Sequence, residues 1–161
     1  MRPGSLTSVT GRGVATISMT DDKPLSFVDT NVLVYAFDKG GSPKAPVAKR
    51  LINELMEEDR LRLSTQVLQE LFVTLTRKVS QRCSSQEALA VLDDLTAWPL
   101  MAIDYGSIRA AVDLADKAML SFWDALVVVA ASRMGATVLY TEDLNAGQEI
   151  LGVRINNPFS K

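Results

Sequence analysis

Four acidic residues, from four separate parts of the chain, occupy positions where a carboxylate adds little to packing: Asp29, Glu70, Asp124 and Asp143. Asp29 directly follows the apolar run 25–28, and ligands of open α/β sheets bind beyond the carboxyl ends of the strands. Carboxylate oxygens that converge on such an edge suit a hard divalent cation. The four acids therefore predict a divalent-metal site.

Local explanations compete for the two acids that follow apolar runs. Asp29 could cap the helix that begins behind it, because Asp is a good N-cap residue. Thr30 and Asn31 extend the polar run beyond what a single cap requires. Asp143 could serve a turn, where Asp is favoured for local hydrogen bonds. It lies just past the apolar run 138–140, however, and so repeats the placement of Asp29.

The other two acids lie within helical patterns. Glu70 flanks the apolar stripe of its helix, so a solvated helix face explains it as well. Asp124 is the only charge between Lys117 and Arg133, in a segment that is apolar on nearly every side. An unpaired carboxylate there would be costly. A capping box with Ser121 and a bound metal ion would each satisfy it, and the sequence leaves both open.

Composition narrows the chemistry. The 161-residue chain has no histidine, which excludes Ser-His and Cys-His catalysis and imidazole ligands. Its one cysteine, Cys83, excludes an internal disulfide and suits a reducing compartment. Catalysis must then use carboxylates, Lys, Tyr, hydroxyl groups or a metal-activated water. The formal net charge of −2 gives no whole-chain indication of nucleic-acid binding.

The chain reads as one domain with an N-terminal arm. Residues 1–23 are rich in Ser, Thr and Gly without helical or strand periodicity, and we expect a flexible arm there. The length suits a single domain, which we place at 24–161. No apolar run reaches the roughly 18 residues that a membrane span needs, so we expect no membrane association and a cytoplasmic protein.

From residue 25 onward, short apolar runs alternate with helical patterns, which is typical of βαβ units around a parallel sheet. Strands are expected over 25–28, 61–64, 100–103, 137–140 and 153–156. Helices are expected over 31–37, 46–56, 65–79, 85–95, 105–118 and 122–134. The fold class is therefore α/β.

Four motifs, in this order, resemble those of the PIN-domain ribonucleases, and most of all the VapC-type toxins of bacterial toxin–antitoxin pairs. They are Phe27-Val28-Asp29-Thr30-Asn31, Leu68-Gln69-Glu70-Leu71, Trp123-Asp124-Ala125-Leu126 and Tyr140-Thr141-Glu142-Asp143-Leu144. The resemblance implies a three-layer α/β/α sandwich with a mostly parallel central sheet of four to five strands. It also implies that the four acids bind metal and are catalytic, with Thr30, Asn31 and Thr141 as supporting polar groups. Glu142 is expected to adjoin the site while facing the other way.

The resemblance further implies a metal-dependent endoribonuclease that hydrolyses RNA phosphodiesters as the toxin of a type II toxin–antitoxin module. An all-oxygen ligand set favours Mg²⁺ or Mn²⁺ over zinc. Attack by an activated water, without the 2′-hydroxyl group, should leave a 5′-phosphate and a 3′-hydroxyl end. The family also implies a cognate antitoxin that covers the site and a toxin homodimer.

Basic residues that could hold the RNA backbone lie at the end of the Glu70 helix: Arg77, Lys78 and Arg82. A second group consists of Lys44, Lys49 and Arg50. Ordinary surface charge explains both groups equally well, because the sequence does not place them beside the site.

Other functions remain as alternatives. A PIN nuclease that processes RNA without being a toxin fits the same motifs, and so does a PIN-like scaffold that binds without cutting. A phosphoacceptor receiver domain would need paired acids after the first strand and a Lys near the last, and neither is present. A phosphatase with an Asp nucleophile would need a second acid where Asn31 stands.

Overall fold

The computed structural model describes residues 6–10, 13–17 and 23–161 of the chain. Its centre is a six-stranded sheet with the strand order β5-β4-β3-β6-β8-β7. The strands are β3 (Ser26–Val28), β4 (Leu61–Ser64), β5 (Leu100–Met101), β6 (Val138–Tyr140), β7 (Glu149–Ile150) and β8 (Val153–Asn156). Neighbouring strands are parallel except β7 and β8, which are antiparallel.

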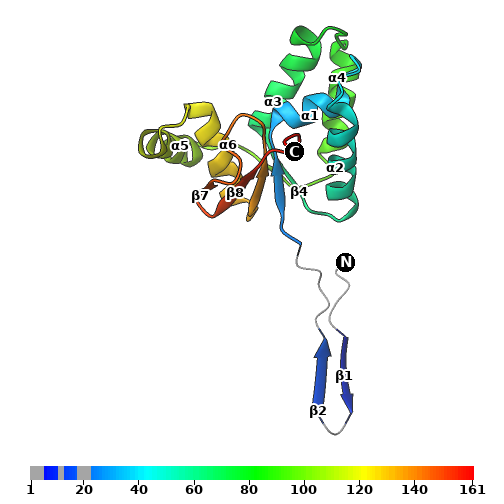
Figure 1. Ribbon diagram of the computed structural model, residues 1–161, viewed down its shortest axis with the longest axis vertical. Coiled ribbons are helices and arrows are strands. Elements are labelled where there is room, and N and C mark those ends of the chain that lie inside the picture. Colours follow the sequence, from blue (N-terminus) through cyan, green and yellow to red (C-terminus); the bar gives the residue numbers. More distant parts are fainter. Residues whose placement is uncertain (1–5, 11–12, 18–22) are drawn as a thin grey trace.

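Helices cover both faces of this sheet. They are α1 (Thr30–Phe37), α2 (Ala45–Glu57), α3 (Thr65–Val73), the π-helix η1 (Thr74–Lys78), α4 (Ser85–Leu95), α5 (Tyr105–Ala118) and α6 (Phe122–Arg133). Figure 1 shows α5 and α6 on one side of the strands and α1 and α2 on the other. The expected three-layer α/β/α fold is confirmed, with β7 as one strand more than the four to five expected. Within the described ranges, no helix is long and apolar enough to cross a membrane.

The core lies between the sheet and its helices. Phe27 and Leu63 from the sheet and Leu33, Leu55 and Leu71 from the helices are all fully buried. Each such side chain contributes roughly 1.5–3 kcal/mol through burial. In α6, residues 125–131 are all buried, which fits its nearly continuous apolar sequence. This packing fixes the central strand β3 relative to the helices.

The strand order places the two acid-bearing loops side by side. From β3 the chain moves outward to β4 and β5, and it returns to β6 on the other side of β3. A crevice forms beyond the carboxyl ends of strands where the order reverses in this way. Asp29 follows β3 and Thr141 follows β6, and the Asp29 N–H donates to the Tyr140 carbonyl at 3.0 Å.

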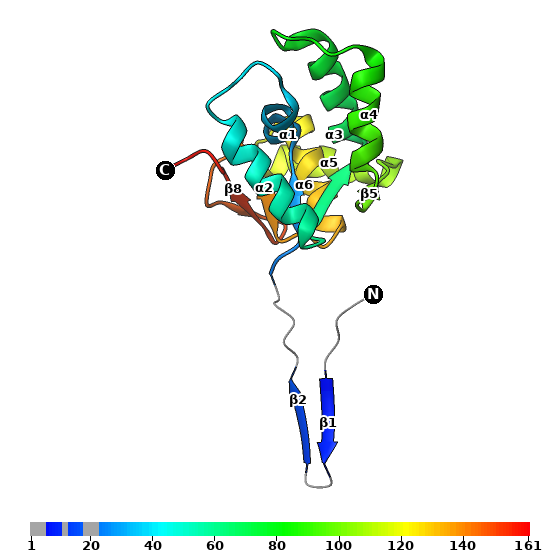
Figure 2. The same ribbon diagram turned by 90° about the vertical axis from the view of Figure 1, so that its right-hand side faces the viewer.

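Upstream of residue 23, the described segments form an antiparallel hairpin of β1 (Leu6–Thr10) and β2 (Gly13–Ile17). Our sequence analysis expected no strand periodicity here. A local hairpin is held by backbone hydrogen bonds and needs no alternating apolar pattern, which explains the difference. Figures 1 and 2 show the hairpin away from the six-stranded sheet. The boundary of the arm near residue 23 stays a prediction.

Candidate metal centre

Asp29 is both a helix cap and part of a polar cluster. It is the N-cap residue of α1, and its Oδ1 accepts a hydrogen bond from the Thr30 N–H at 2.7 Å. Its Oδ2 accepts from the Thr141 hydroxyl at 2.9 Å and from Asn31 Nδ2 at 3.3 Å. Only 6% of the residue is exposed. The capping explanation is therefore correct without excluding a place in the site.

The electrostatic surroundings of Asp29 disfavour its negative charge. Burial raises the pKa of Asp29 from 3.8 to about 6, against the opposing effect of hydrogen bonds from Thr141 and Thr30. The negative charges of Glu70 and Asp143 raise this pKa further. A buried carboxylate that is held ionised near two other carboxylates favours a neutralising cation.

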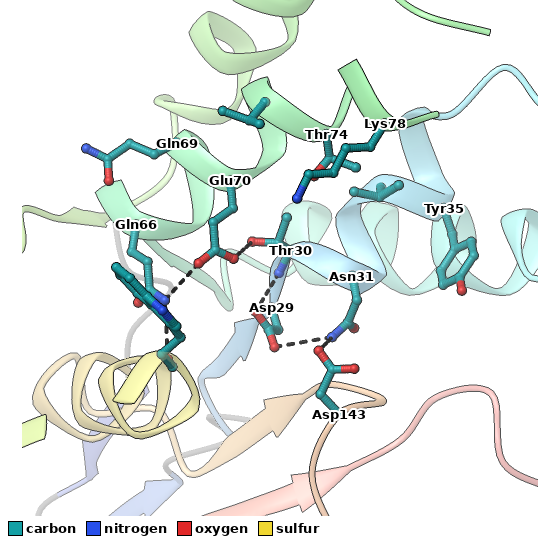
Figure 3. A pocket seen from close by; sticks show the side chains of 13 residues that line it. Asp29, Thr30, Asn31, Tyr35, Gln66, Gln69, Glu70, Thr74, Lys78 and Asp143 are labelled. Carbon is teal, nitrogen blue, oxygen red and sulfur yellow. Dashed lines mark hydrogen bonds between the residues drawn. The ribbon is translucent and has the colours of Figure 1, made fainter. Parts of the chain in front are cut away.

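Asn31 bridges the loops that follow β3 and β6. Its Nδ2 donates to Asp143 Oδ2 at 2.9 Å and to Thr141 Oγ1 at 3.1 Å, in addition to Asp29. Its Oδ1 accepts from the Glu142 N–H at 3.3 Å. The buried Thr141 hydroxyl also accepts from the Asp143 N–H at 3.1 Å. The amide of Asn31 thus fixes the relative positions of Asp29 and Asp143 (Figure 3).

Glu70 enters the same site from α3. Its Oε2 accepts from the Thr30 hydroxyl at 3.1 Å, and its Oε1 accepts from Gln66 Nε2 at 3.0 Å. Gln66 also donates to the Trp123 carbonyl at 3.2 Å, so one amide joins α3 to the first turn of α6. Among the described residues, Gln66 Oε1 is the one buried side-chain nitrogen or oxygen atom without a hydrogen-bond partner.

Gln66 is a site residue that our sequence analysis missed. It lies four residues before Glu70, the spacing at which side chains on one helix face meet. That spacing alone could have suggested a contact with Glu70. The contact with Trp123 depends on how α3 and α6 pack, which no local pattern indicates.

These side chains line one cavity of about 660 Å³. Its polar lining includes Asp29, Glu70, Asp143, Thr30, Asn31, Gln66 and Lys78, and its apolar lining includes Val34, Val73 and Trp123. Figure 3 shows the carboxylates of Glu70, Asp29 and Asp143 arranged around the same space. The structure therefore brings three of the four predicted acids to one site.

Asp124 is placed differently. It lies in the first turn of α6 next to Trp123, but it is not among the residues that line the cavity. Its N–H donates to Ser121 Oγ at 3.1 Å, which is one half of a capping box. The reciprocal hydrogen bond, from the Ser121 N–H to the Asp124 carboxylate, is not formed. Capping by Ser121 is therefore present, and metal binding by Asp124 stays a prediction.

The oxygen atoms of the three acids are the type of ligand that a hard cation prefers, but they do not lie close enough together to coordinate one ion. Within the described part of the chain, no three acidic groups lie close enough together to hold one ion. The Thr30 hydroxyl and the Asn31 amide instead satisfy carboxylate oxygens of Glu70 and Asp143. Carboxylate oxygens without sulfur or imidazole ligands are what Mg²⁺ and Mn²⁺ prefer. Side-chain rotation would have to bring these oxygens closer together.

The Glu142 carboxylate is held by Lys44 and Tyr35, and Glu142 is not among the residues that line the cavity. Its Oε2 forms an ion pair with Lys44 Nζ at 2.6 Å, and its Oε1 accepts from the Tyr35 hydroxyl at 2.8 Å. The hydrogen bond with Glu142 raises the pKa of Lys44. Lys44 also lies over the rings of Tyr35 and Phe159, with Nζ 5.0 and 5.2 Å from their centroids. Through Lys44 and Tyr35, Glu142 thus anchors the loop after β6 to α1 and to the start of α2.

Of the predicted basic residues, Lys78 lines the cavity, while Arg77 and Arg82 are exposed and do not. Lys78 is the last residue of η1, where we expected α-helix through residue 79. A π-helical turn inserts one extra residue into the helix and often occurs at functional sites. Figure 3 shows the Lys78 side chain directed into the cavity. In the second basic group, Lys44 is paired with Glu142.

A family model of the PIN domain matches residues 26–148, which is more than half of the chain. The chain therefore belongs to the PIN domain family. This confirms the family that the motifs indicated.

Among solved structures, the chain is similar to the VapC20 toxin of Mycobacterium tuberculosis, described as cleaving the sarcin–ricin loop. The identity is 22% and the TM-score 0.62, over 80% of this chain and 98% of that chain. A toxin–antitoxin complex from Klebsiella pneumoniae has 18% identity and a TM-score of 0.63, over 84% of this chain and 99% of that chain. DNA-bound VapBC from Salmonella typhimurium has 19% identity and a TM-score of 0.58, over 84% of this chain and 99% of that chain. At these identities the likeness shows a shared fold. A search of curated protein sequences gave no match.

Proposed function

We propose that this protein is a metal-dependent endoribonuclease that hydrolyses RNA phosphodiester bonds. Asp29, Glu70 and Asp143 would hold Mg²⁺ or Mn²⁺, with Asp124 as a fourth ligand. The observation that carries the proposal is that three acids from separate elements line one cavity where the strand order reverses. Membership of the PIN family supports it, because the matched residues 26–148 contain all four acids.

The protein's own groups would orient the reactants. The Thr30 N–H and the Thr141 hydroxyl fix the Asp29 carboxylate, and Asn31 fixes Asp143. Lys78 is placed to hold a phosphate oxygen of the substrate. A bound divalent ion supplies Lewis-acid stabilisation of the phosphate. Water adds its oxygen to phosphorus while the bond to the 3′ oxygen breaks, so the products carry a 5′-phosphate and a 3′-hydroxyl.

We further propose that the protein is a toxin of a type II toxin–antitoxin pair, acting in the cytoplasm as a homodimer and bound by a cognate antitoxin. The support is the similarity in fold to a toxin–antitoxin complex from Klebsiella pneumoniae and to DNA-bound VapBC from Salmonella typhimurium. Co-expression with the product of a small adjoining gene tests the partner: stable co-purification with loss of RNA cleavage is expected. A neighbouring product that neither binds nor inhibits would contradict the toxin assignment.

One observation favours a non-catalytic PIN-like scaffold as the second candidate. Within the described residues, the acids are not close enough for three of them to hold an ion as they stand. A scaffold of this kind would bind RNA or protein but would neither bind Mn²⁺ nor cut RNA.

Cleavage of RNA by the purified protein separates the two candidates. We expect cutting with Mg²⁺ or Mn²⁺, none with EDTA, and a loss of roughly 100-fold in Asp143→Asn, because that variant keeps an oxygen for Asn31 but removes the charge. Asp93→Asn, on the exposed face of α4, is the matched control and should cut normally. Cyclic phosphate ends, or equal activity of Asp143→Asn and wild type, would contradict the proposed mechanism.

A further inference from the structure

Trp123 is unusually exposed for its place in the fold. Its exposed fraction is 61%, although residues 125–131 of the same helix are all buried. A tryptophan is mostly buried when it serves only packing, and a large exposed apolar group often marks a binding site. Trp123 lines the cavity that holds Asp29, Glu70 and Asp143. The indole is therefore available to a molecule that reaches the acids.

The position of Trp123 is fixed relative to the catalytic candidates. Its carbonyl accepts from Gln66 Nε2, and the same amide group donates to Glu70 Oε1. Its ring packs edge-on against Phe122, with centroids 5.0 Å apart and an interplanar angle of 74°. With its backbone held by Gln66 and its ring packed against Phe122, Trp123 loses little entropy when a ligand stacks on it.

The rest of the lining supplies partners for a nucleotide. Val73, 43% exposed, adds apolar surface to the same cavity, and Lys78 adds a positive charge. An aromatic face and a cation match the base and the phosphate of one nucleotide.

We propose that Trp123 is a stacking platform for an unpaired base of single-stranded RNA, next to the phosphate that lies at the acids. This rests on the proposed function, because it assigns a substrate-binding residue to that site. Bases in an A-form duplex are stacked on one another and cannot present a free face to Trp123, whereas unpaired bases can.

Binding without cleavage tests the platform. A fluorescein-labelled single-stranded RNA of mixed sequence is titrated with the full chain in EDTA, and anisotropy is recorded for wild type, Trp123→Leu and Trp123→Phe. We expect about tenfold weaker binding for Trp123→Leu, since stacking contributes about 1–3 kcal/mol per base. Trp123→Phe should recover most of the affinity. Annealing the RNA into a duplex should abolish the difference between wild type and Trp123→Leu.

Tryptophan emission gives a second readout that does not depend on the folding of a Trp123 variant. Trp98, whose Nε1 donates to the Met56 carbonyl at 3.3 Å, does not line this cavity. In Trp98→Phe, Trp123 is the sole tryptophan, and single-stranded RNA should quench its emission. Unchanged emission, no binding of single-stranded RNA, or equal affinities of Trp123→Leu and wild type would overturn the platform. Stacking without metal-dependent cleavage would instead refute the proposed nuclease.

Discussion

Asp29 has an unusual combination of properties at the scale of a single residue. It caps a helix, it is almost completely buried, and two other acids add to the cost of its charge. A cap alone would be satisfied by a neutral Asn or Ser. A charged carboxylate at this position is explained if a bound cation neutralises it, and we therefore propose the metal site here.

The raised pKa of Asp29 predicts how the stability of the metal-free protein depends on pH. The folded-state pKa is about 6 against 3.8 for the ordinary group, so the folded protein binds the proton more tightly. Protonation of Asp29 therefore contributes about 3 kcal/mol to the free energy of unfolding. The contribution is fully present below pH 3.8 and is lost as the pH rises through about 6.

Urea unfolding in EDTA at several values between pH 5 and 8, for wild type and Asp29→Asn, measures the part of this contribution that is lost above pH 5. Surface acids such as Glu58, whose pKa is lowered by Lys23 and Arg60, give the opposite trend but act equally in both proteins. The free energy of unfolding of wild type should fall relative to Asp29→Asn as the pH rises. A pH-independent difference between them would contradict the burial argument.

Gln66 should act as a positioning residue for Glu70. Gln66→Met keeps the side-chain length but removes the donor to Glu70 Oε1, so the carboxylate loses its fixed orientation. We expect Mn²⁺ affinity to fall roughly tenfold, as for other groups that orient metal ligands. Gln69→Met is the matched control, because Gln69 is exposed on the same helix and Figure 3 shows it directed away from Glu70. Equal affinities in the two variants would contradict the role of Gln66.

Local sequence signals located most elements but not their irregularities. Asp104 and Ser84 accept hydrogen bonds from backbone N–H groups at the starts of the helices that we expected over 105–118 and 85–95. The π-helix η1 was missed because residues 65–79 keep one helical period, which does not distinguish a π-helical turn from an α-helical one. The strand β7 was missed because its two residues carry no periodicity of their own.

At the element scale, the pair of Lys44 and Glu142 connects α2's N-terminus to the loop after β6. Glu142→Gln removes the ionic part of this pair while its amide oxygen can still accept from Tyr35. Side-chain exposures of 40% and 21% leave the pair partly screened by solvent, so we expect a small loss in unfolding free energy.

The matched control is Asp113→Asn, which breaks a fully solvated pair with Lys117. It should change the unfolding free energy less than Glu142→Gln does, and 1 M salt should reduce the difference between the two variants, because salt screens exposed charges. A larger effect of Asp113→Asn, in the same denaturation experiment, would mean that Glu142 does not anchor the loop.

The whole molecule explains why the site was only partly predictable. The acids after β3 and β6 could be paired from sequence, because parallel strands deliver their carboxyl ends to one edge. Metal binding by Asp124 stays a prediction. The places of Gln66 and Trp123 in the site could not be predicted, because they depend on how α3 packs against α6. The net charge of −2 also gave no indication of nucleic-acid binding. The acids that line the cavity outnumber Lys78 in that sum, so the sum does not reveal a positive charge beside them.

Calorimetric titration of the full chain with Mn²⁺ tests the central claim most directly, because it measures metal binding apart from any RNA. At pH 7.5 we expect binding to wild type and to Asp93→Asn, and at least about tenfold weaker binding to Asp143→Asn. Binding should also weaken at pH 5, where a proton competes for Asp29, whose pKa is about 6. No binding by wild type, or equal affinities of wild type and Asp143→Asn, would contradict the assignment of these acids to a metal site.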